Sequence, residues 1–151
     1  MNKASRRTKN NLYGVHHKLV MLVGYALAIS EQDFFVNEGL RTDENQNKFY
    51  KQGTSQIDGY KKRGKHQDDL STPDIDARAV DVYYTGWTNK DKVNDPRWEK
   101  IYEAFRIASK MLNIKIEFGK DWKTLVDKPH IQLAKGEWLN AFLKYFIWSY
   151  F

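Results

Sequence analysis

Two hydrophobic patterns follow one another directly between Pro96 and Phe118. After Pro96, large apolar residues return at every third or fourth position, which is typical of an amphipathic helix that begins at a proline. The segment IKIEF, residues 114–118, then alternates apolar and polar residues and predicts a half-buried strand. A helix and a strand that each have one apolar face are stable when they share a core, so we expect an α+β fold. The apolar face of the helix comprises Trp98, Ile101, Tyr102, Phe105, Ala108 and Leu112.

The rest of the chain predicts further short elements that are too scattered for a regular βαβ repeat. Thr42 and Asp43 are suited to cap a helix that stops at Gly53. The polar, turn-rich segment 54–76 predicts a long loop, and loops of that length are usually functional or disordered. We expect helices over about 17–30 and 44–52, and strands in DFFVNEGL (33–40, ending at Gly39), ARAVDVYY (77–84) and around HIQL (130–133).

Composition favours one folded domain over residues 1–151. Apolar residues make up 41% of the chain, enough for a core, and there is no repeat or linker rich in Gly, Ser or Pro. The apolar run LVMLVGYALAIS after the basic start resembles a signal-peptide core, but its helical spacing favours a buried helix. No stretch is long enough to span a membrane. We expect an aromatic C-terminal helix over about 136–151, packed on the core in preference to touching a membrane.

The chain has no cysteine and four histidines, so any metal ion must be held by His, Asp or Glu. The net charge of +6 favours encounters with polyanions such as an anionic cell envelope. Nucleic acid is not expected as a partner, because the basic residues are dispersed and KKRGK is their one compact cluster.

The tetrapeptide DKPH, residues 127–130, is the first candidate for chemistry. Pro129 holds the chain extended, so a carboxylate from Asp127 and the ring of His130 can reach one pocket. This arrangement suits a metal ligand beside a carboxylate base. The tetrapeptide alone favours the structural alternative, a strand histidine hydrogen-bonded to a neighbouring aspartate, because such pairs are common at turns.

A second pair is formed by His66 and Asp81. A carboxylate among the apolar residues of ARAVDV is costly to bury unless it is paired or binds a metal; the alternative is a solvent-exposed position at a strand edge. Two histidines, one carboxylate and a position open to water make a catalytic zinc arrangement. Arg41, in EGLRT, can bind a substrate carboxylate or an oxyanion, or can form a surface ion pair.

The order of the segments GVHHKLV, VNEGLRTDENQNKFYKQG, DGYKKRGKHQ, ARAVDV, GKDW and DKPHIQL resembles the phage branch of the LAS zinc peptidases. That group includes VanY-like D-alanyl-D-alanine carboxypeptidases and L-alanyl-D-glutamate endopeptidase endolysins. The resemblance runs from about residue 5 to residue 133. It implies a small domain with a short antiparallel sheet flanked by helices, similar to Hedgehog and DD-peptidase domains.

The resemblance also implies roles for individual residues. The zinc ligands would be His66, Asp81 and His130, with Asp127 as general base and Arg41 as a group that binds or polarises substrate. Trp122 would lie at the pocket wall, and Gln46 would contribute to substrate binding.

The chain departs from the family pattern just before and after His66. Gly64 stands where the family has a serine, and residues 67–80 separate His66 from Asp81, which is longer than usual. We therefore expect a loop insertion at about 67–76. Asp74 lies nearer the family spacing, but Asp81 keeps the AxD motif on a hydrophobic strand and is the preferred ligand. The other acids, Asp68, Asp69, Asp74 and Asp76, predict a solvated loop that could bind calcium.

The implied substrate is bacterial peptidoglycan. An endolysin would cut the L-Ala–D-Glu bond of the peptide stem, and the alternative is a D-Ala–D-Ala carboxypeptidase. A non-catalytic zinc- or polyanion-binding module of the same fold belongs to a different class. We expect a monomer that is made in the host cytoplasm without a cleaved signal peptide. It would act in the periplasm or cell wall after the membrane is permeabilised.

Overall fold

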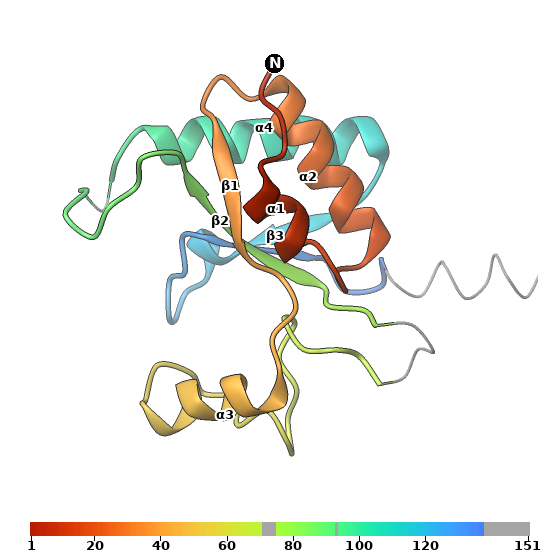
Figure 1. The fold of residues 1–151 in the computed structure, drawn as a ribbon, viewed down its shortest axis with the longest axis vertical. Coiled ribbons are helices and arrows are strands. Elements are labelled where there is room, and N and C mark those ends of the chain that lie inside the picture. The colour runs from red at the N-terminus through yellow and green to blue at the C-terminus, as the bar shows by residue number, and fades with distance from the viewer. Residues whose placement is uncertain (71–74, 93, 138–151) are drawn as a thin grey trace, which may run out of the picture.

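The computed structural model describes residues 1–70, 75–92 and 94–137 (Figure 1). Within these residues, four strands form one antiparallel sheet in the order β1-β2-β4-β3. The strands are β1 (Phe34–Glu38), β2 (Ala79–Tyr84), β3 (Ile116–Phe118) and β4 (His130–Leu133). The helices are α1 (Arg6–Asn11), α2 (His17–Ile29), α3 (Asp43–Lys51) and α4 (Arg97–Leu112), with a 3-10 turn η1 (Gly119–Asp121). The expected α+β class is confirmed.

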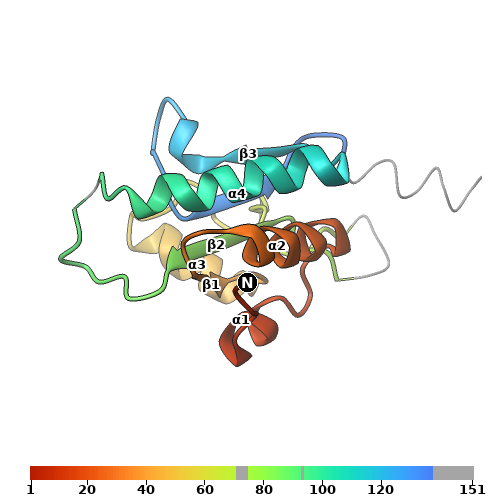
Figure 2. The same cartoon turned by 90° about the horizontal axis from the view of Figure 1, so that it is seen from above.

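The core lies between the sheet and the helices α2 and α4, which pack against each other (Figure 2). Because side chains alternate along a strand, Val80 and Val82 of β2 point to these helices and are fully buried. The apolar run at the start of the chain is therefore a core helix, as its spacing predicts. Its buried residues are Leu19, Leu22, Val23, Ala26 and Leu27.

Local signals define the ends of two predicted helices. The Thr42 hydroxyl accepts a hydrogen bond from the Asn45 backbone N–H at 3.3 Å and caps α3. Pro96 precedes α4, whose last turn is closed by Asn113 in the left-handed conformation, at φ 52°. These caps explain why the predicted boundaries agree closely with the observed ones.

Two features differ from expectation. The helix α1 was not predicted, because RRTKNN has no apolar periodicity; polar bonds attach it to β1, where the Asn11 amide donates to the carbonyls of Val36 and Asn37. The strand β3 is shorter than IKIEF, because the Ile114 N–H closes the end of α4 by donating to the Ser109 carbonyl at 3.0 Å.

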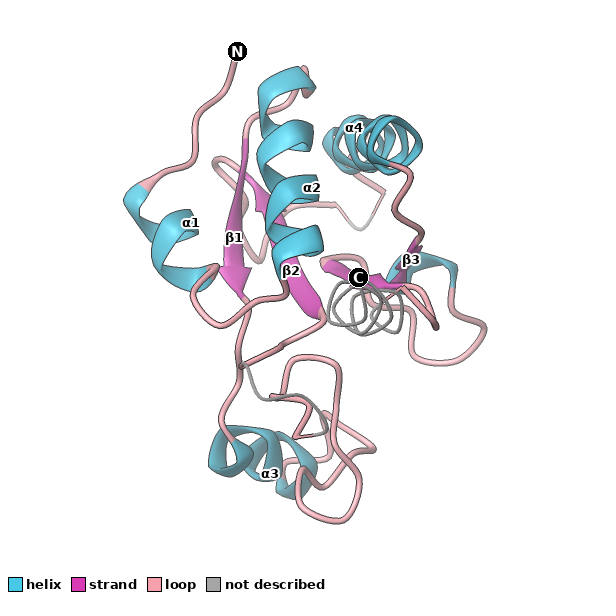
Figure 3. Cartoon of the chain, turned by 90° about the vertical axis from the view of Figure 1, so that its right-hand side faces the viewer, coloured by secondary structure: helices cyan, strands magenta, loops and turns pink. Residues whose placement is uncertain are grey.

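The long segment between α3 and β2 is the predicted loop, and it lies with α3 away from the α2–α4 pair (Figures 1 and 3). Polar side chains organise it. The Asp58 carboxylate accepts three successive backbone N–H groups, and the Arg63 guanidinium binds the Asp43 carboxylate at 2.8 and 3.0 Å.

The prediction of a solvated acidic loop is wrong for Asp76. Asp76 is 6% exposed, and its carboxylate pairs with the guanidinium of Arg78, which is itself buried. Asp69 pairs with the same guanidinium, so two acids of the proposed insertion neutralise one buried cation. Asp74 and residues 138–151, which carry nearly all of the expected C-terminal helix, lie outside the described residues.

Candidate metal centre

Cross-strand register brings three ionisable residues into one row. Glu38 of β1 lies opposite Asp81 of β2, and Asp81 lies opposite His130 of β4. Directly opposed residues share a face of the sheet, and this face is the one turned away from the α2–α4 core. The His130 Nδ1 atom is 3.4 Å from the Asp81 Oδ1 atom.

His66 joins this row from the long loop. Two short backbone bonds hold the loop there: the Arg41 N–H donates to the His66 carbonyl, and the Arg78 N–H donates to the Lys65 carbonyl, both at 2.7 Å. The His66 Nε2 atom lies 3.1 Å from Asp81 Oδ1 and 3.2 Å from His130 Nδ1. The three residues thus offer two imidazole nitrogens and a carboxylate oxygen within 4.8 Å of one another, a group that can hold a metal ion.

The ring of His66 is oriented by a hydrogen bond at Nδ1, the ring nitrogen that does not face Asp81 and His130. Nδ1 lies 2.8 Å from the carbonyl oxygen of Gly39, which can only accept, so Nδ1 carries the proton and the Nε2 lone pair faces the site. Gly39 has no space for a side chain, because a Cβ would lie 2.0 Å from the Asn11 carbonyl oxygen. The glycine therefore keeps its carbonyl within reach of His66.

The charges within the group are strongly coupled. Burial alone would raise the pKa of Asp81, but the charge of His66 and hydrogen bonds from both histidines hold it well below its usual range. Burial alone would lower the pKa of His66, but the Asp81 carboxylate outweighs this effect and raises it. In the absence of a metal ion, the negative charge of Asp81 therefore favours a proton on the neighbouring His66 ring. A bound cation would take the place of that proton.

Asp127 lies in a tight turn that ends at His130. The His130 N–H donates to the Asp127 carbonyl at 3.3 Å, and the Asp127 N–H donates to the Gly119 carbonyl at 3.0 Å. A Cβ on Gly119 would approach the Asp127 carbonyl oxygen to 2.4 Å and the His130 Cβ to 2.9 Å. Only glycine fits there without movement of the turn, so η1 supports the position of Asp127.

The carboxyl group of Asp127 shares the electrostatic environment of the centre. Burial raises its pKa, and the neighbouring charge of Asp81 raises it further, while His130, His66 and Arg41 oppose the rise. A carboxylate with a raised pKa next to a metal-binding group is suited to accept and return a proton.

Trp122 stands directly beside the centre. Its ring centroid is 4.8 Å from that of His130, at an interplanar angle of 48°, and the residue is half-buried. This contact places Trp122 next to a residue of the metal-binding group, and its position at a pocket wall stays a prediction. Contact with substrate remains a prediction.

Arg41 is close to the centre but is held by protein groups. Its Nε donates to the Glu38 carboxylate at 2.8 Å, a second bond joins the same two groups, and Nη1 donates to Gln46 Oε1 at 2.9 Å. The Nη2 atom is 3.8 Å from Asp81 Oδ2. The guanidinium also stacks over the Phe49 ring at 4.7 Å. Arg41 therefore presents one edge to the site, in an orientation that its neighbours determine.

Gln46 lies behind Arg41. It is 2% exposed, and its amide nitrogen donates to Ser55 Oγ and to the Ile57 carbonyl, both at 2.9 Å. Because its oxygen accepts a hydrogen bond from Arg41, every hydrogen bond of the Gln46 side chain in the structure is made to a protein group. The expected direct contact of Gln46 with substrate is therefore not supported by its position.

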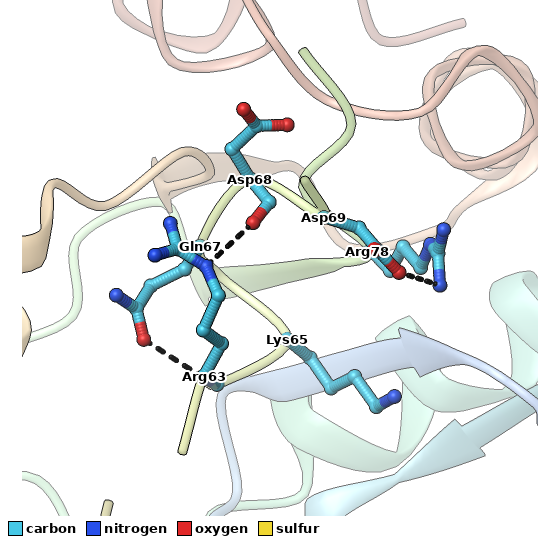
Figure 4. A pocket seen from close by; sticks show the side chains of 7 residues that line it. Arg63, Lys65, Gln67, Asp68, Asp69 and Arg78 are labelled. Carbon is cyan, nitrogen blue, oxygen red and sulfur yellow. Dashed lines mark hydrogen bonds and ion pairs between the residues drawn. The ribbon is translucent and has the colours of Figure 1, made fainter. Parts of the chain in front are cut away.

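A separate pocket adjoins the His66 loop (Figure 4). It contains none of the three residues of the metal-binding group. Its cations are engaged by neighbours: the Arg63 Nε donates to the Asp68 carbonyl at 2.9 Å, and Arg78 pairs with Asp69. The Asp68 carboxylate accepts the Asp76 N–H at 3.0 Å, so the described acids of the insertion are all bound to protein groups, and calcium binding there remains a prediction. The pocket is lined by Arg63, Gly64, Lys65, Gln67, Asp68, Asp69 and Arg78.

The sequence profile of the phage L-alanyl-D-glutamate peptidases matches residues 1–135, which include all of the centre. The chain belongs to this family. Among solved structures it is similar to the L-Ala D-Glu endopeptidase ChiX of Serratia marcescens, with 31% identity over 90% of this chain and 92% of that one, and a TM-score of 0.72. No significant match was found among curated proteins.

This phage-type peptidase is accordingly an enzyme that acts on peptidoglycan. The recognition of the family from RT, AxD, GxDW and DxPH is confirmed, as is the small antiparallel fold. Among its described residues, no helix has the length and apolar character needed to cross a membrane.

Sequence reasoning missed three groups that orient the centre: Glu38, Gln132 and the carbonyl of Gly39. Gln132 follows His130 by two positions on a strand, so strand periodicity placed both on one face and was a usable signal. The backbone carbonyl of Gly39 leaves no signal in the sequence, because every residue has one.

Proposed function

We propose that this peptidase is a zinc enzyme that cleaves the L-Ala–D-Glu bond in the peptide stem of bacterial peptidoglycan. The substrate bond follows from the family and from the activity named for the Serratia relative. The observation that carries the metal assignment is the convergence of His66, Asp81 and His130.

The donor separations support zinc. Ligand atoms at about 2.0–2.1 Å from a tetrahedral zinc ion lie about 3.3 Å apart. The three separations in this centre are 3.1, 3.2 and 3.4 Å, so the side chains need little movement to bind the ion. Three protein ligands leave a fourth position for water, which is the arrangement of catalytic zinc sites. When bound, the ion would lower the pKa of that water and polarise the scissile carbonyl.

The protein groups around the ligands have complementary tasks. Asp127 takes a proton from the attacking water and returns it to the leaving amine. Its partial burial, which raises the pKa of its carboxyl group, suits it to carry a proton between the two steps. Trp122 shields one side of His130 and lines the approach to it.

We also propose that Arg41 binds the oxygen that becomes negatively charged during attack, or a nearby substrate carboxylate. Replacing Arg41 with lysine keeps the positive charge but removes the fork that holds Glu38 and Gln46 together. We expect kcat/KM to fall by about 10²-fold, at the lower end of the range for losing one oriented donor. Steady-state kinetics on soluble stem peptides measures this. Unchanged kcat/KM would remove Arg41 from the site's chemistry.

The remaining proposals concern the whole chain. We propose that residues 1–151 form one catalytic domain, with about 67–76 as an insertion, and that the protein works as a monomer. We further propose that it reaches the cell wall from the host cytoplasm once the membrane is permeabilised. Its net charge of +6 favours approach to an anionic envelope. Light scattering of the purified protein tests the monomer, and a dimer at micromolar concentration would contradict it.

The proposed function is tested by mass spectrometry of fragments released from purified peptidoglycan, with and without a chelator. We expect cuts that expose a new D-Glu amino terminus and that stop when the chelator is present. Release of D-alanine alone would identify a carboxypeptidase instead. No release with added zinc, across several stem chemistries, would support a non-catalytic binding module.

A further inference from the structure

The far nitrogen of His130 is bound by a side chain. The His130 Nε2 atom lies 3.0 Å from Gln132 Oε1, and the Gln132 amide nitrogen donates to Glu117 Oε2 at 2.7 Å. Strand geometry explains both contacts. His130 and Gln132 are two positions apart on β4 and share a face, and Glu117 of β3 lies directly opposite Gln132.

The Glu117 carboxylate determines which way the Gln132 amide points. An ionised carboxylate only accepts hydrogen bonds, so the NH₂ group of Gln132 must face Glu117 and its oxygen must face His130. The oxygen in turn requires a proton on His130 Nε2. The lone pair of His130 is then on Nδ1, the atom that faces His66 and Asp81.

We propose that Glu117 and Gln132 form a relay that keeps His130 in the tautomer whose Nδ1 binds the metal ion, and so strengthen metal binding. Both are positioning residues, since they act through His130. The relay rests on the proposed role of His130 as a ligand. It goes beyond that role by assigning a task to two residues that otherwise only pair across β3 and β4.

The two histidines of the centre are oriented by different means. His66 binds through Nε2 and is held by the backbone carbonyl of Gly39, which no side-chain substitution removes. His130 binds through Nδ1 and is held by Gln132, which is replaceable. The neighbouring β4 residues Ile131 and Leu133 face the core and are fully buried, whereas Gln132 is half-buried on the site's face. A substitution at Gln132 therefore perturbs the centre without opening the core.

The test is the zinc affinity of purified full-length variants, measured by competition with a chromophoric chelator. Replacing Gln132 with leucine removes the acceptor, and we expect zinc to bind about 10- to 100-fold more weakly, as found when a ligand histidine loses its outer partner. Glu117→Leu frees the amide to turn and should weaken binding by a smaller factor. Glu117→Gln still offers an acceptor oxygen to Gln132 and should stay within about twofold of wild type.

A matched control is Gln56→Leu, which makes the same replacement at an exposed position in the loop after α3. It should leave zinc affinity unchanged. Thermal unfolding of the metal-free variants checks that Gln132→Leu folds. Long-range ¹H–¹⁵N spectra of the metal-free proteins, recorded where His130 is neutral, should show the Nε2–H tautomer of His130 in the wild type and a mixture of both tautomers in Gln132→Leu, a change that a purely structural role would not produce.

The outcomes separate the relay from the metal centre. Zinc affinity of Gln132→Leu within about twofold of wild type, or zinc bound through His130 Nε2, would overturn the relay and leave the centre intact. Failure of the wild-type protein to bind zinc at all would overturn the centre and the relay together.

Discussion

Replacing Asp127 with asparagine is expected to lower kcat by about 10²- to 10⁴-fold while zinc stays bound. Asparagine has nearly the same size, so the turn that joins Gly119 to His130 through backbone bonds can be retained. The amide oxygen is a very weak base, so it cannot take the proton of the attacking water. The loss should therefore appear in turnover and leave metal content unchanged.

Stem-peptide turnover and zinc content, measured on the same preparation, decide this prediction. Asp121→Asn is the matched control, because Asp121 is exposed in η1, beside the same turn. It should behave as wild type in both measurements. Loss of zinc from Asp127→Asn would mean that Asp127 is a ligand, and full activity would mean that another group acts as base.

Replacing Asp81 with asparagine is expected to weaken zinc binding by at least about 100-fold and to abolish peptidase activity. Asp81 supplies the only carboxylate of the three-residue group, between two histidines. Its carboxylate also lies 3.8 Å from the Arg41 guanidinium and offsets that positive charge beside the bound ion, so its removal increases charge repulsion at the centre. Both effects act in the same direction and disfavour the assembled centre.

Asp74→Asn is the informative partner of this variant. Asp74 lies nearer the spacing that the family pattern suggests, so it is the competing ligand. We expect Asp74→Asn to keep zinc and activity. The opposite result, with zinc retained by Asp81→Asn and lost from Asp74→Asn, would assign the carboxylate to the insertion. Metal content by elemental mass spectrometry, together with chelator competition, distinguishes the two.

The elements that could be predicted are those with strong local signals. Thr42 and Pro96 mark helix starts, and the periodicity after Pro96 requires a buried face, so α3 and α4 were predicted near their observed bounds. Alternation in ARAVDV likewise explains why Val80 and Val82 lie on one face of β2 and Asp81 on the other. The helix α1 was missed because tertiary contacts from Asn11 and Thr8 to β1 support it, and these leave no periodic pattern.

The sequence indicated which residues form the candidate site, but it gave little information about their burial and hydrogen-bond partners. The residues by themselves left structural explanations open for His66, Asp81 and His130, and the family resemblance implied all three as zinc ligands. Gln46 was assigned to substrate because its position in the helix is visible in the sequence and its burial is not. Asp76 was taken as solvated for a similar reason, since its partner Arg78 is a cation that the sequence does not show to be buried.

The sequence by itself determined most of the elements, their apolar faces and the residue types able to bind a metal ion, because these depend on local periodicity and side-chain chemistry. The tertiary structure decided which of them meet. Antiparallel register set Asp81 against His130, and backbone bonds brought the His66 loop onto that pair. The carbonyl of Gly39 and the amide of Gln132 then selected which nitrogen of each histidine faces the centre, because hydrogen bonds between distant segments form only after the chain has folded.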